Sequence, residues 1–172
     1  MMLNARLHIV VTVRYASTTA DLRSPELWFS RARKMRRKII CHTGPTNSGK
    51  THAALTALAN AKTGVYCGPL RLLASEVYTT LNERYQIPTC LRTGQELEEV
   101  ANACHLSSTV EMCPFAFGVG EGGVAGAPWE CAVIDEAQLI GDTQRGWAWT
   151  RALLGLEAHE IHLCGSPSML SL

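Results

Sequence analysis

The sequence predicts an α/β fold in which a mostly parallel β-sheet carries helices on both faces. Short apolar runs alternate with helical stretches along the chain, and this alternation is typical of parallel sheets. Two apolar runs, at residues 38–42 and 131–134, lead directly into a glycine-rich and an acidic motif. Open α/β sheets bind their ligands at such strand ends. With 172 residues and 47% hydrophobic side chains, the chain can bury one core of this kind.

The individual elements follow from local composition, in chain order. Residues 38–42 (Lys-Ile-Ile-Cys-His) form a short apolar run that predicts a buried parallel strand. Residues 52–59 contain alanine and leucine in abundance, which favours a helix. Beyond them the pattern predicts strands at residues 65–67, 89–92, 109–112, 131–134 and 160–164, helices at residues 70–84 and 147–154, and a glycine-rich loop at residues 118–128.

Residues 44–51 read Gly-Pro-Thr-Asn-Ser-Gly-Lys-Thr, a complete phosphate-binding loop of the G-x-x-x-x-G-K-[ST] type. Gly44 and Gly49 allow a tight turn, and the helix that follows favours anions at its N-terminus. Lys50 would reach the β- and γ-phosphates of a nucleotide, and the Thr51 hydroxyl would bind Mg²⁺. The turn would also hold the backbone N–H groups of the middle residues against the phosphates: Thr46, Asn47 and Ser48.

The acidic motif that such a loop needs lies about eighty residues further on. Asp135 follows the apolar run at residues 131–134, so it should emerge at the carboxyl end of a strand. An aspartate there can hold Mg²⁺ through its water shell, and Glu136 can orient or deprotonate an attacking water. The two motifs together predict a nucleoside triphosphatase.

Charge is distributed unevenly along the chain, although the net charge is only +1. Nine basic and two acidic residues fall within the first forty positions, whereas seven basic and thirteen acidic residues fall in the remaining 132. A uniformly basic nucleic-acid-binding surface is therefore excluded. The first twenty residues contain Arg6, Arg14 and a Ser-Thr-Thr run but no acid, which is typical of a mitochondrial transit peptide; the alternative is a disordered basic tail. Their longest apolar stretch is too short to span a bilayer, so no membrane insertion is expected.

The seven cysteines show no C-x-x-C spacing, and several fall within predicted strands. We interpret them as buried thiols in a reducing compartment, not as zinc ligands or disulfides.

Seven blocks, in order along the chain, carry a resemblance to a known family. They are the phosphate-binding loop, Gly-Val-Tyr-Cys-Gly-Pro-Leu-Arg-Leu-Leu-Ala at 64–74, Thr-Gly-Gln-Glu at 93–96, Thr-Val-Glu-Met-Cys at 109–113, Val-Ile-Asp-Glu-Ala-Gln at 133–138, Arg-Gly-Trp-Ala-Trp-Thr-Arg-Ala-Leu-Leu-Gly at 145–155 and His-Leu-Cys-Gly at 162–165. In these blocks the chain resembles the Suv family of mitochondrial RNA helicases, from about residue 21 to about residue 167. That family belongs to helicase superfamily two and works with an exoribonuclease in the mitochondrial RNA degradosome.

The resemblance implies a RecA-like domain that uses ATP and Mg²⁺ to unwind RNA, with RNA–DNA hybrids or DNA as further substrates, in the mitochondrial matrix. It implies that Gln138 couples the nucleotide site to the rest of the enzyme. Three short motifs would contact the phosphates of one nucleic-acid strand, as backbone N–H groups, hydroxyls and an arginine at strand ends are suited to do. Their residues are Gly68, Pro69 and Arg71, Thr93 and Gly94, and Thr109 and Glu111. Trp147 and Trp149 are expected to pack in the core, since aromatic residues at helical spacing usually do.

The sequence also departs from the family pattern. Ala137 stands where a larger apolar residue is expected, and Gly-Ser-Pro-Ser at residues 165–168 replaces Gly-Glu-Pro-Ala, a segment that couples hydrolysis to unwinding. We expect a leader at residues 1–20, a basic lead-in at 21–38 and a first RecA-like domain at 39–172. The second RecA-like domain, with its arginine finger, is expected to be absent, which would make the chain alone a poor ATPase.

Two other functions share part of this pattern. A thymidine-kinase-like phosphotransferase also uses a phosphate-binding loop and an Asp-Glu-Ala-Gln motif, but it carries a cysteine zinc site that this sequence lacks. A non-enzymatic nucleotide-binding module that docks onto a partner is the other alternative.

Overall fold

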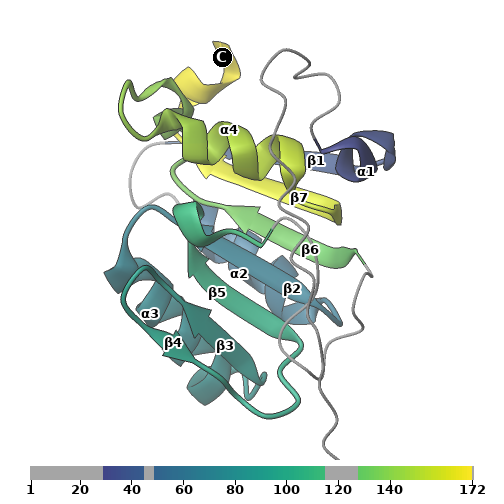
Figure 1. Ribbon diagram of the computed structural model, residues 1–172, viewed down its shortest axis with the longest axis vertical. Coiled ribbons are helices and arrows are strands. Elements are labelled where there is room, and N and C mark those ends of the chain that lie inside the picture. Colours follow the sequence, from purple (N-terminus) through teal and green to yellow (C-terminus); the bar gives the residue numbers. More distant parts are fainter. Residues whose placement is uncertain (1–28, 45–48, 115–127, 172) are drawn as a thin grey trace, which may run out of the picture.

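The computed structural model of the chain describes residues 29–44, 49–114 and 128–171. A seven-stranded sheet in the order β1-β7-β6-β2-β5-β3-β4 forms its centre (Figure 1). Every strand pair is parallel except β3 with β4, which is antiparallel. The strands are β1 (Lys38–Thr43), β2 (Gly64–Gly68), β3 (Thr89–Arg92), β4 (Leu97–Glu98), β5 (His105–Thr109), β6 (Trp129–Ile134) and β7 (Ala158–Gly165).

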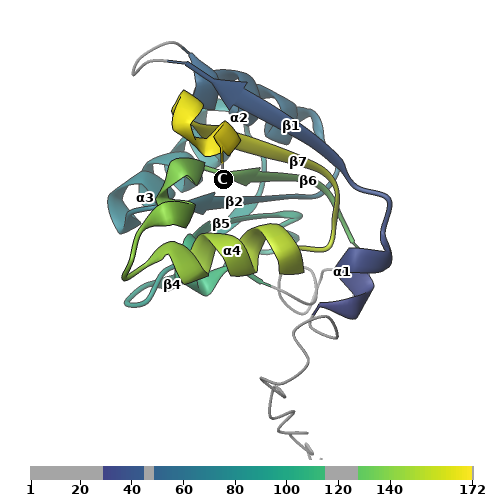
Figure 2. The same ribbon diagram turned by 90° about the horizontal axis from the view of Figure 1, so that it is seen from above.

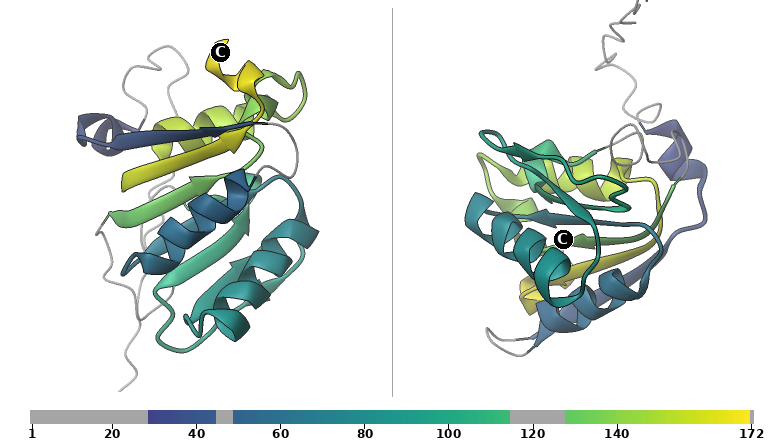
Figure 3. Two further views of the ribbon diagram at one scale, coloured as in Figure 1. Left: turned by 180° about the vertical axis from the view of Figure 1, so that it is seen from behind. Right: turned by 90° about the horizontal axis from the view of Figure 1, so that it is seen from below.

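Helices cover both faces of this sheet, as predicted. Figure 2 shows α4 on one face and α2 and α3 on the other, and Figure 3 shows α2 and α3 from their own side. The α-helices are α1 (Ser30–Lys34), α2 (Lys50–Asn60), α3 (Arg71–Thr79) and α4 (Gly146–Gly155). A π-helical turn, η2 (Thr80–Arg84), continues α3, and the 3₁₀ turns are η3 (Val110–Met112), η4 (Ala137–Gly141) and η5 (Pro167–Ser171).

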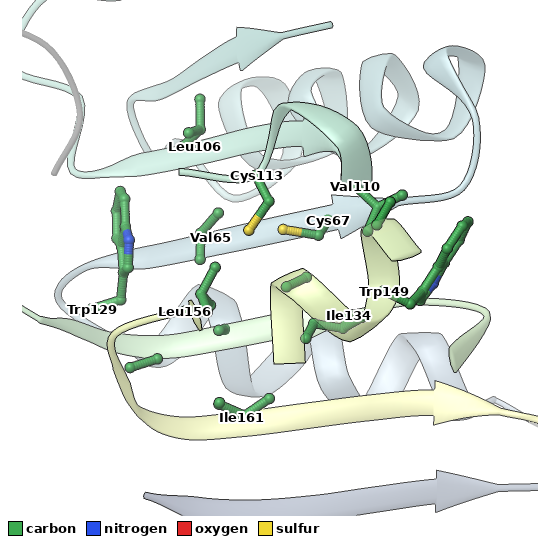
Figure 4. Close-up of a cluster of buried hydrophobic side chains, with 14 of the residues drawn as sticks. Val65, Cys67, Leu106, Val110, Cys113, Trp129, Ile134, Trp149, Leu156 and Ile161 are labelled. Carbon is green, nitrogen blue, oxygen red and sulfur yellow. The ribbon is translucent and has the colours of Figure 1, made fainter. Parts of the chain in front are cut away.

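Two hydrophobic clusters form the core, one on each face of the sheet. In β2, Val65 and Cys67 belong to the cluster beneath α4, whereas Tyr66 belongs to the cluster beneath α2 and α3. The same alternation occurs in β6, because successive side chains of a strand point to opposite faces. The α4 cluster contains the largest buried side chain, that of Trp149 (Figure 4).

One predicted strand was misplaced, and one was missed. We predicted a strand at residues 109–112, but β5 ends at Thr109 and η3 follows. The strand escaped prediction because its buried positions are polar: Ser107 Oγ donates to the Ala74 carbonyl (2.6 Å) and Ser108 Oγ to the Tyr66 carbonyl (3.1 Å). The two-residue strand β4 is exposed and too short to have a detectable pattern.

Two predictions of side-chain burial, for the tryptophans and for the cysteines, were only partly right. Trp149 is fully buried, as expected, but Trp147 is 54% exposed, because residues two apart on a helix do not face the same way. Cys41 is exposed and Cys104 half-buried, while the other five cysteines are buried; all seven are free thiols. Cys41 is exposed because it lies on β1, the edge strand of the sheet.

The glycine-rich loop predicted at residues 118–128 lies outside the described residues except for its last position, and residues 1–28 lie outside them as well. Among the helices that the structure describes, none is long and apolar enough to cross a membrane.

Candidate functional site

The parallel strands bring their carboxyl ends to one edge of the sheet, and both nucleotide motifs lie there. The phosphate-binding loop follows β1 and leads into α2, while Asp135 follows β6. Strand β7 separates β1 from β6. The two motifs are far apart in the sequence but lie close together at this edge of the sheet, as we expected from their positions.

The described part of the phosphate-binding loop has the backbone expected for this motif. Gly49 is the N-cap residue of α2 and has a φ of 82°, a left-handed conformation that glycine adopts without a steric penalty. The Lys50 ammonium donates to the Gly44 carbonyl at 2.9 Å, so its side chain reaches back to the first residue of the motif. The predicted phosphate contacts of Thr46, Asn47 and Ser48 fall outside the described residues.

Thr51 and Asp135 are 84 residues apart in the sequence but in contact in space. The Thr51 hydroxyl donates to the Asp135 carboxylate, at 3.3 Å to Oδ1 and 3.4 Å to Oδ2. Asp135 is 5% exposed, and its carboxylate also accepts hydrogen bonds from the Tyr66 hydroxyl (3.0 Å) and the Glu136 N–H (2.9 Å). Three groups thus converge at this carboxylate, and two of them come from segments far away in the sequence.

Burial sets the electrostatics of this cluster. It raises the pKa of the Asp135 carboxyl above its ordinary value, and the nearby charge of Glu136 raises that pKa further. Hydrogen bonds from the Glu136 N–H, Tyr66 and Thr51 act in the opposite direction, because they favour the ionised form. A carboxylate and a hydroxyl side by side are ligands that suit Mg²⁺, and a cation there would offset the desolvation of Asp135.

Glu136 and Gln138 connect the acidic motif to the end of β7. Glu136 has a φ of 51°, an uncommon conformation for a residue other than glycine and one that is often found at functional sites. The Gln138 side-chain amide donates to the Glu136 carboxylate, and its Oε1 accepts the Ser166 N–H at 3.0 Å. A Cβ atom at Gly165 would lie 2.5 Å from Gln138 Oε1. Gln138 therefore bridges Glu136 and the Gly-Ser-Pro-Ser segment.

A groove of about 470 Å³ lies at the same edge of the sheet, beyond β2 and β5. Five of the seven predicted nucleic-acid contacts line it; Gly68 is buried at the end of β2, and Thr93 stabilises the adjacent turn by accepting the N–H groups of Gln95 (3.3 Å) and Glu96 (3.0 Å). The lining residues are Pro69, Leu70, Arg71, Gly94, Gln95, Thr109, Glu111, Met112 and Arg145.

Sequence reasoning missed Tyr66 beside Asp135, and in the groove it missed Leu70, Gln95, Met112 and Arg145. Tyr66 lies in the middle of β2, and only its hydrogen bond to Asp135 identifies it as part of the cluster around that carboxylate. Arg145 lines the groove and forms an ion pair with Glu111 at 2.7 Å. The only available signal for Arg145 was that it opens a family-like block without an assigned role.

Comparison with known proteins identifies the family to which the domain belongs. Residues 25–172 match the family model of the DEXQ-box helicase domain of Suv3, whose signature corresponds to residues 135–138 here. The chain is 52% identical over 153 residues to the ATP-dependent RNA helicase SUV3L, mitochondrial, of Oryza sativa subsp. japonica. It is 52% identical over 157 residues to the ATP-dependent RNA helicase SUV3 homolog, mitochondrial, of Drosophila melanogaster, and 51% identical over 157 residues to the ATP-dependent RNA helicase SUPV3L1, mitochondrial, of Homo sapiens.

Each of these alignments covers 89% of this chain but 19% of the relative. The chain thus spans about a fifth of the length of these relatives, and that fifth contains both nucleotide motifs. The family match extends over most of the chain and includes every block that lines the nucleotide site and the groove. The chain belongs to the Suv3 family of DEXQ-box helicases.

Proposed function

We propose that this chain is the ATP-binding RecA-like domain of a mitochondrial ATP-dependent RNA helicase, in which ATP hydrolysis drives RNA unwinding. The observation that carries the proposal is the contact between Thr51 and Asp135, since it joins the two nucleotide motifs into one site. The names of the relatives support ATP as the nucleotide, RNA as the substrate and the mitochondrion as the location. Within the mitochondrion we propose the matrix. Family membership favours this function over a thymidine-kinase-like one.

The phosphate-binding loop would hold the nucleotide. Lys50 would exchange the Gly44 carbonyl for the β- and γ-phosphates, because a charged acceptor binds an ammonium more strongly than a neutral one. The backbone N–H of Gly49 and the N-terminus of α2 would face the phosphates, together with the N–H groups of Thr46, Asn47 and Ser48.

Thr51 and Asp135 would hold Mg²⁺, which supplies charge neutralisation at the phosphates when it is bound. Glu136 would orient or deprotonate the attacking water, with its side chain positioned by the Gln138 amide. Because Gln138 also binds the Ser166 backbone, it is placed to couple this site to the end of β7. Beyond the domain at residues 39–172, we propose a mitochondrial leader at residues 1–20, a basic lead-in at 21–38 and an exoribonuclease as a partner of the full helicase.

Nucleotide binding by the full 172-residue chain tests the proposal directly. Charge-assisted hydrogen bonds contribute about 1.5–3 kcal/mol each, so Lys50→Ala should weaken ATP binding by about 10-fold to 150-fold in isothermal titration calorimetry with Mg²⁺. Lys62→Ala, which changes an exposed lysine just beyond α2, should leave the affinity unchanged. Equal affinities in wild type and Lys50→Ala would contradict the proposed site. ATP hydrolysis that single-stranded RNA stimulates and Lys50→Ala abolishes would count against a non-enzymatic module.

RNA binding by the groove is tested separately by its salt dependence. Arg71 lies in the groove, where its guanidinium donates to the Gln95 side chain. If it contacts one phosphate, Arg71→Ala should weaken binding of single-stranded RNA several-fold at all sequences and reduce the salt slope by about 0.7, as measured by fluorescence anisotropy. Arg84→Ala, an exposed arginine in η2 beyond the far end of α3, is the matched control. Identical salt slopes for wild type and Arg71→Ala would mean that the RNA strand does not contact Arg71. Parallel measurements with DNA of the same sequence would show which substrate is preferred.

A further inference from the structure

Arg145 joins two walls of the groove. Its Nε and Nη2 donate to Glu111 Oε1 at 2.9 and 2.7 Å, and Nη2 also donates to the Pro69 carbonyl at 2.6 Å. Pro69 follows β2, and Glu111 lies in η3, which follows β5. One guanidinium therefore fixes the positions of two segments that the proposed RNA strand would contact.

The Arg145 guanidinium also contacts Trp149, which in turn contacts the proposed nucleotide site. Its Cζ is 5.3 Å from the centre of the Trp149 ring, within the range of a cation–π interaction. Trp149 is fully buried at the end of the α4 cluster (Figure 4), and its indole Nε1 donates to the Asp135 carbonyl at 2.9 Å. Arg145 and Trp149 thus form a continuous chain of contacts from the groove wall to the backbone of the residue proposed to hold Mg²⁺.

The energetics favour a positioning role for Arg145 over a stabilising one. The side chains of Arg145 and Glu111 are 43% and 31% exposed, and ion pairs so accessible to solvent contribute at most about 1 kcal/mol. The planar guanidinium instead fixes the relative positions of Glu111, Pro69 and the Trp149 ring, because it contacts all three at once. It also neutralises Glu111, whose charge would otherwise repel a phosphate in the groove.

We propose that Arg145 is a positioning residue that couples RNA binding in the groove to nucleotide binding at Asp135, through Trp149. This inference rests on the proposed function. A strand that contacts Pro69 or Glu111 would shift the guanidinium, and the Trp149 indole would transmit that shift to the Asp135 carbonyl. By linkage the effect is reciprocal, so bound nucleotide should change RNA affinity by the same factor.

The coupling factor is measured by titrating the full chain with a non-hydrolysable ATP analogue and Mg²⁺, with and without saturating oligouridylate RNA. We expect RNA to change the nucleotide affinity of the wild type at least about fivefold. Arg145→Lys keeps the charge but loses the planar fork, so the factor should fall below about twofold while nucleotide affinity without RNA stays within about twofold of wild type. The same factor in Arg145→Lys as in wild type would overturn the proposal.

Arg151 provides a matched control in α4, the helix whose N-cap residue is Arg145. It also donates to the backbone carbonyl of Glu111 (2.8 Å) and lies over a tryptophan ring, but that ring belongs to the exposed Trp147 (5.0 Å). Arg151→Lys should therefore retain the wild-type factor, and loss of coupling in this variant as well would overturn the proposal.

A second pair of variants keeps the test decisive if Arg145→Lys fails to fold. Trp149→Phe keeps a ring beneath Arg145 but removes the donor to Asp135, so it should lower the factor, whereas Trp147→Phe should not. A factor of one in the wild type, with nucleotide binding intact, would overturn the coupling and leave the nucleotide site standing. Loss of nucleotide binding by the wild type would instead contradict the proposed function, and the coupling with it.

Discussion

Asp135→Asn is expected to raise the free energy of unfolding at neutral pH while abolishing the effect of Mg²⁺ on ATP affinity. The carboxylate is 5% exposed, and burial raises its pKa, so its ionised form is disfavoured in the folded protein. Asparagine removes the charge and keeps the shape. Its Oδ1 can accept the Glu136 N–H and the Thr51 hydroxyl, and its Nδ2 can donate to the Tyr66 hydroxyl oxygen, so all three neighbours retain a partner.

The pH dependence identifies the cause of this gain. An aspartate in the unfolded chain has a pKa of about 3.9, and that of folded Asp135 is higher. Between the two values the folded state binds more protons, so the wild type loses stability as pH rises through this window. Asp135→Asn does not titrate. Its advantage should therefore be absent below about pH 3.9, grow through the window and remain constant above the raised pKa.

The size of the gain should be about 0.5–2 kcal/mol, the range of stabilising changes at sites where function requires an unfavourable group. Denaturant titrations from about pH 3 to pH 8 measure it, and calorimetry with and without Mg²⁺ measures the loss of the metal effect. Glu160→Gln provides a control of opposite sign. A hydrogen bond from Lys38 lowers the pKa of Glu160, so this variant should be slightly less stable at neutral pH, with the difference vanishing in acid. A neutral-pH stability of Asp135→Asn below that of wild type would contradict the burial argument.

The nucleotide site was largely predictable from sequence because its parts are fixed by local geometry. A glycine-rich turn between an apolar strand and a helix specifies the loop, and an acidic pair after a second apolar strand specifies the proposed metal ligand. Parallel strands then bring both to one edge of the sheet. The contact of Thr51 with Asp135 confirms that the two motifs meet.

What sequence could not supply are residues whose role depends on neighbours from other segments. Tyr66 fits the alternating pattern of any strand. Its importance comes from its hydrogen bond to Asp135, which follows the neighbouring strand β6. Arg145 meets Glu111 and Pro69 only because η3 and the end of β2 converge on the start of α4. Strand β5 was misplaced for the same reason, since its buried hydroxyls find backbone carbonyls in α3 and β2 that no local pattern predicts.

Gly146→Ala is expected to destabilise the domain through the junction between η4 and α4. A Cβ at Gly146 would lie 2.3 Å from the Ile140 carbonyl oxygen and 3.2 Å from that of Leu139. Both atoms belong to the backbone of η4, which continues directly from the Asp135 motif, so no side-chain rotation can relieve the collision. The two elements must move apart. We expect a loss of about 3 kcal/mol, the upper end for overpacking, together with weaker ATP binding because η4 carries Gln138.

Gly94→Ala separates this collision from the general effect of adding a methyl group. A Cβ at Gly94 would meet no atom within 4 Å, and the backbone there does not have a positive φ, so its stability should stay within about 0.5 kcal/mol of wild type. Thermal and denaturant unfolding of the two variants side by side measure the difference. Equal stabilities would mean that η4 can shift without loss, and that α4 does not hold the acidic motif in place. A Gly146→Ala protein that is destabilised but keeps wild-type ATP affinity would separate the packing of α4 from the positioning of Asp135.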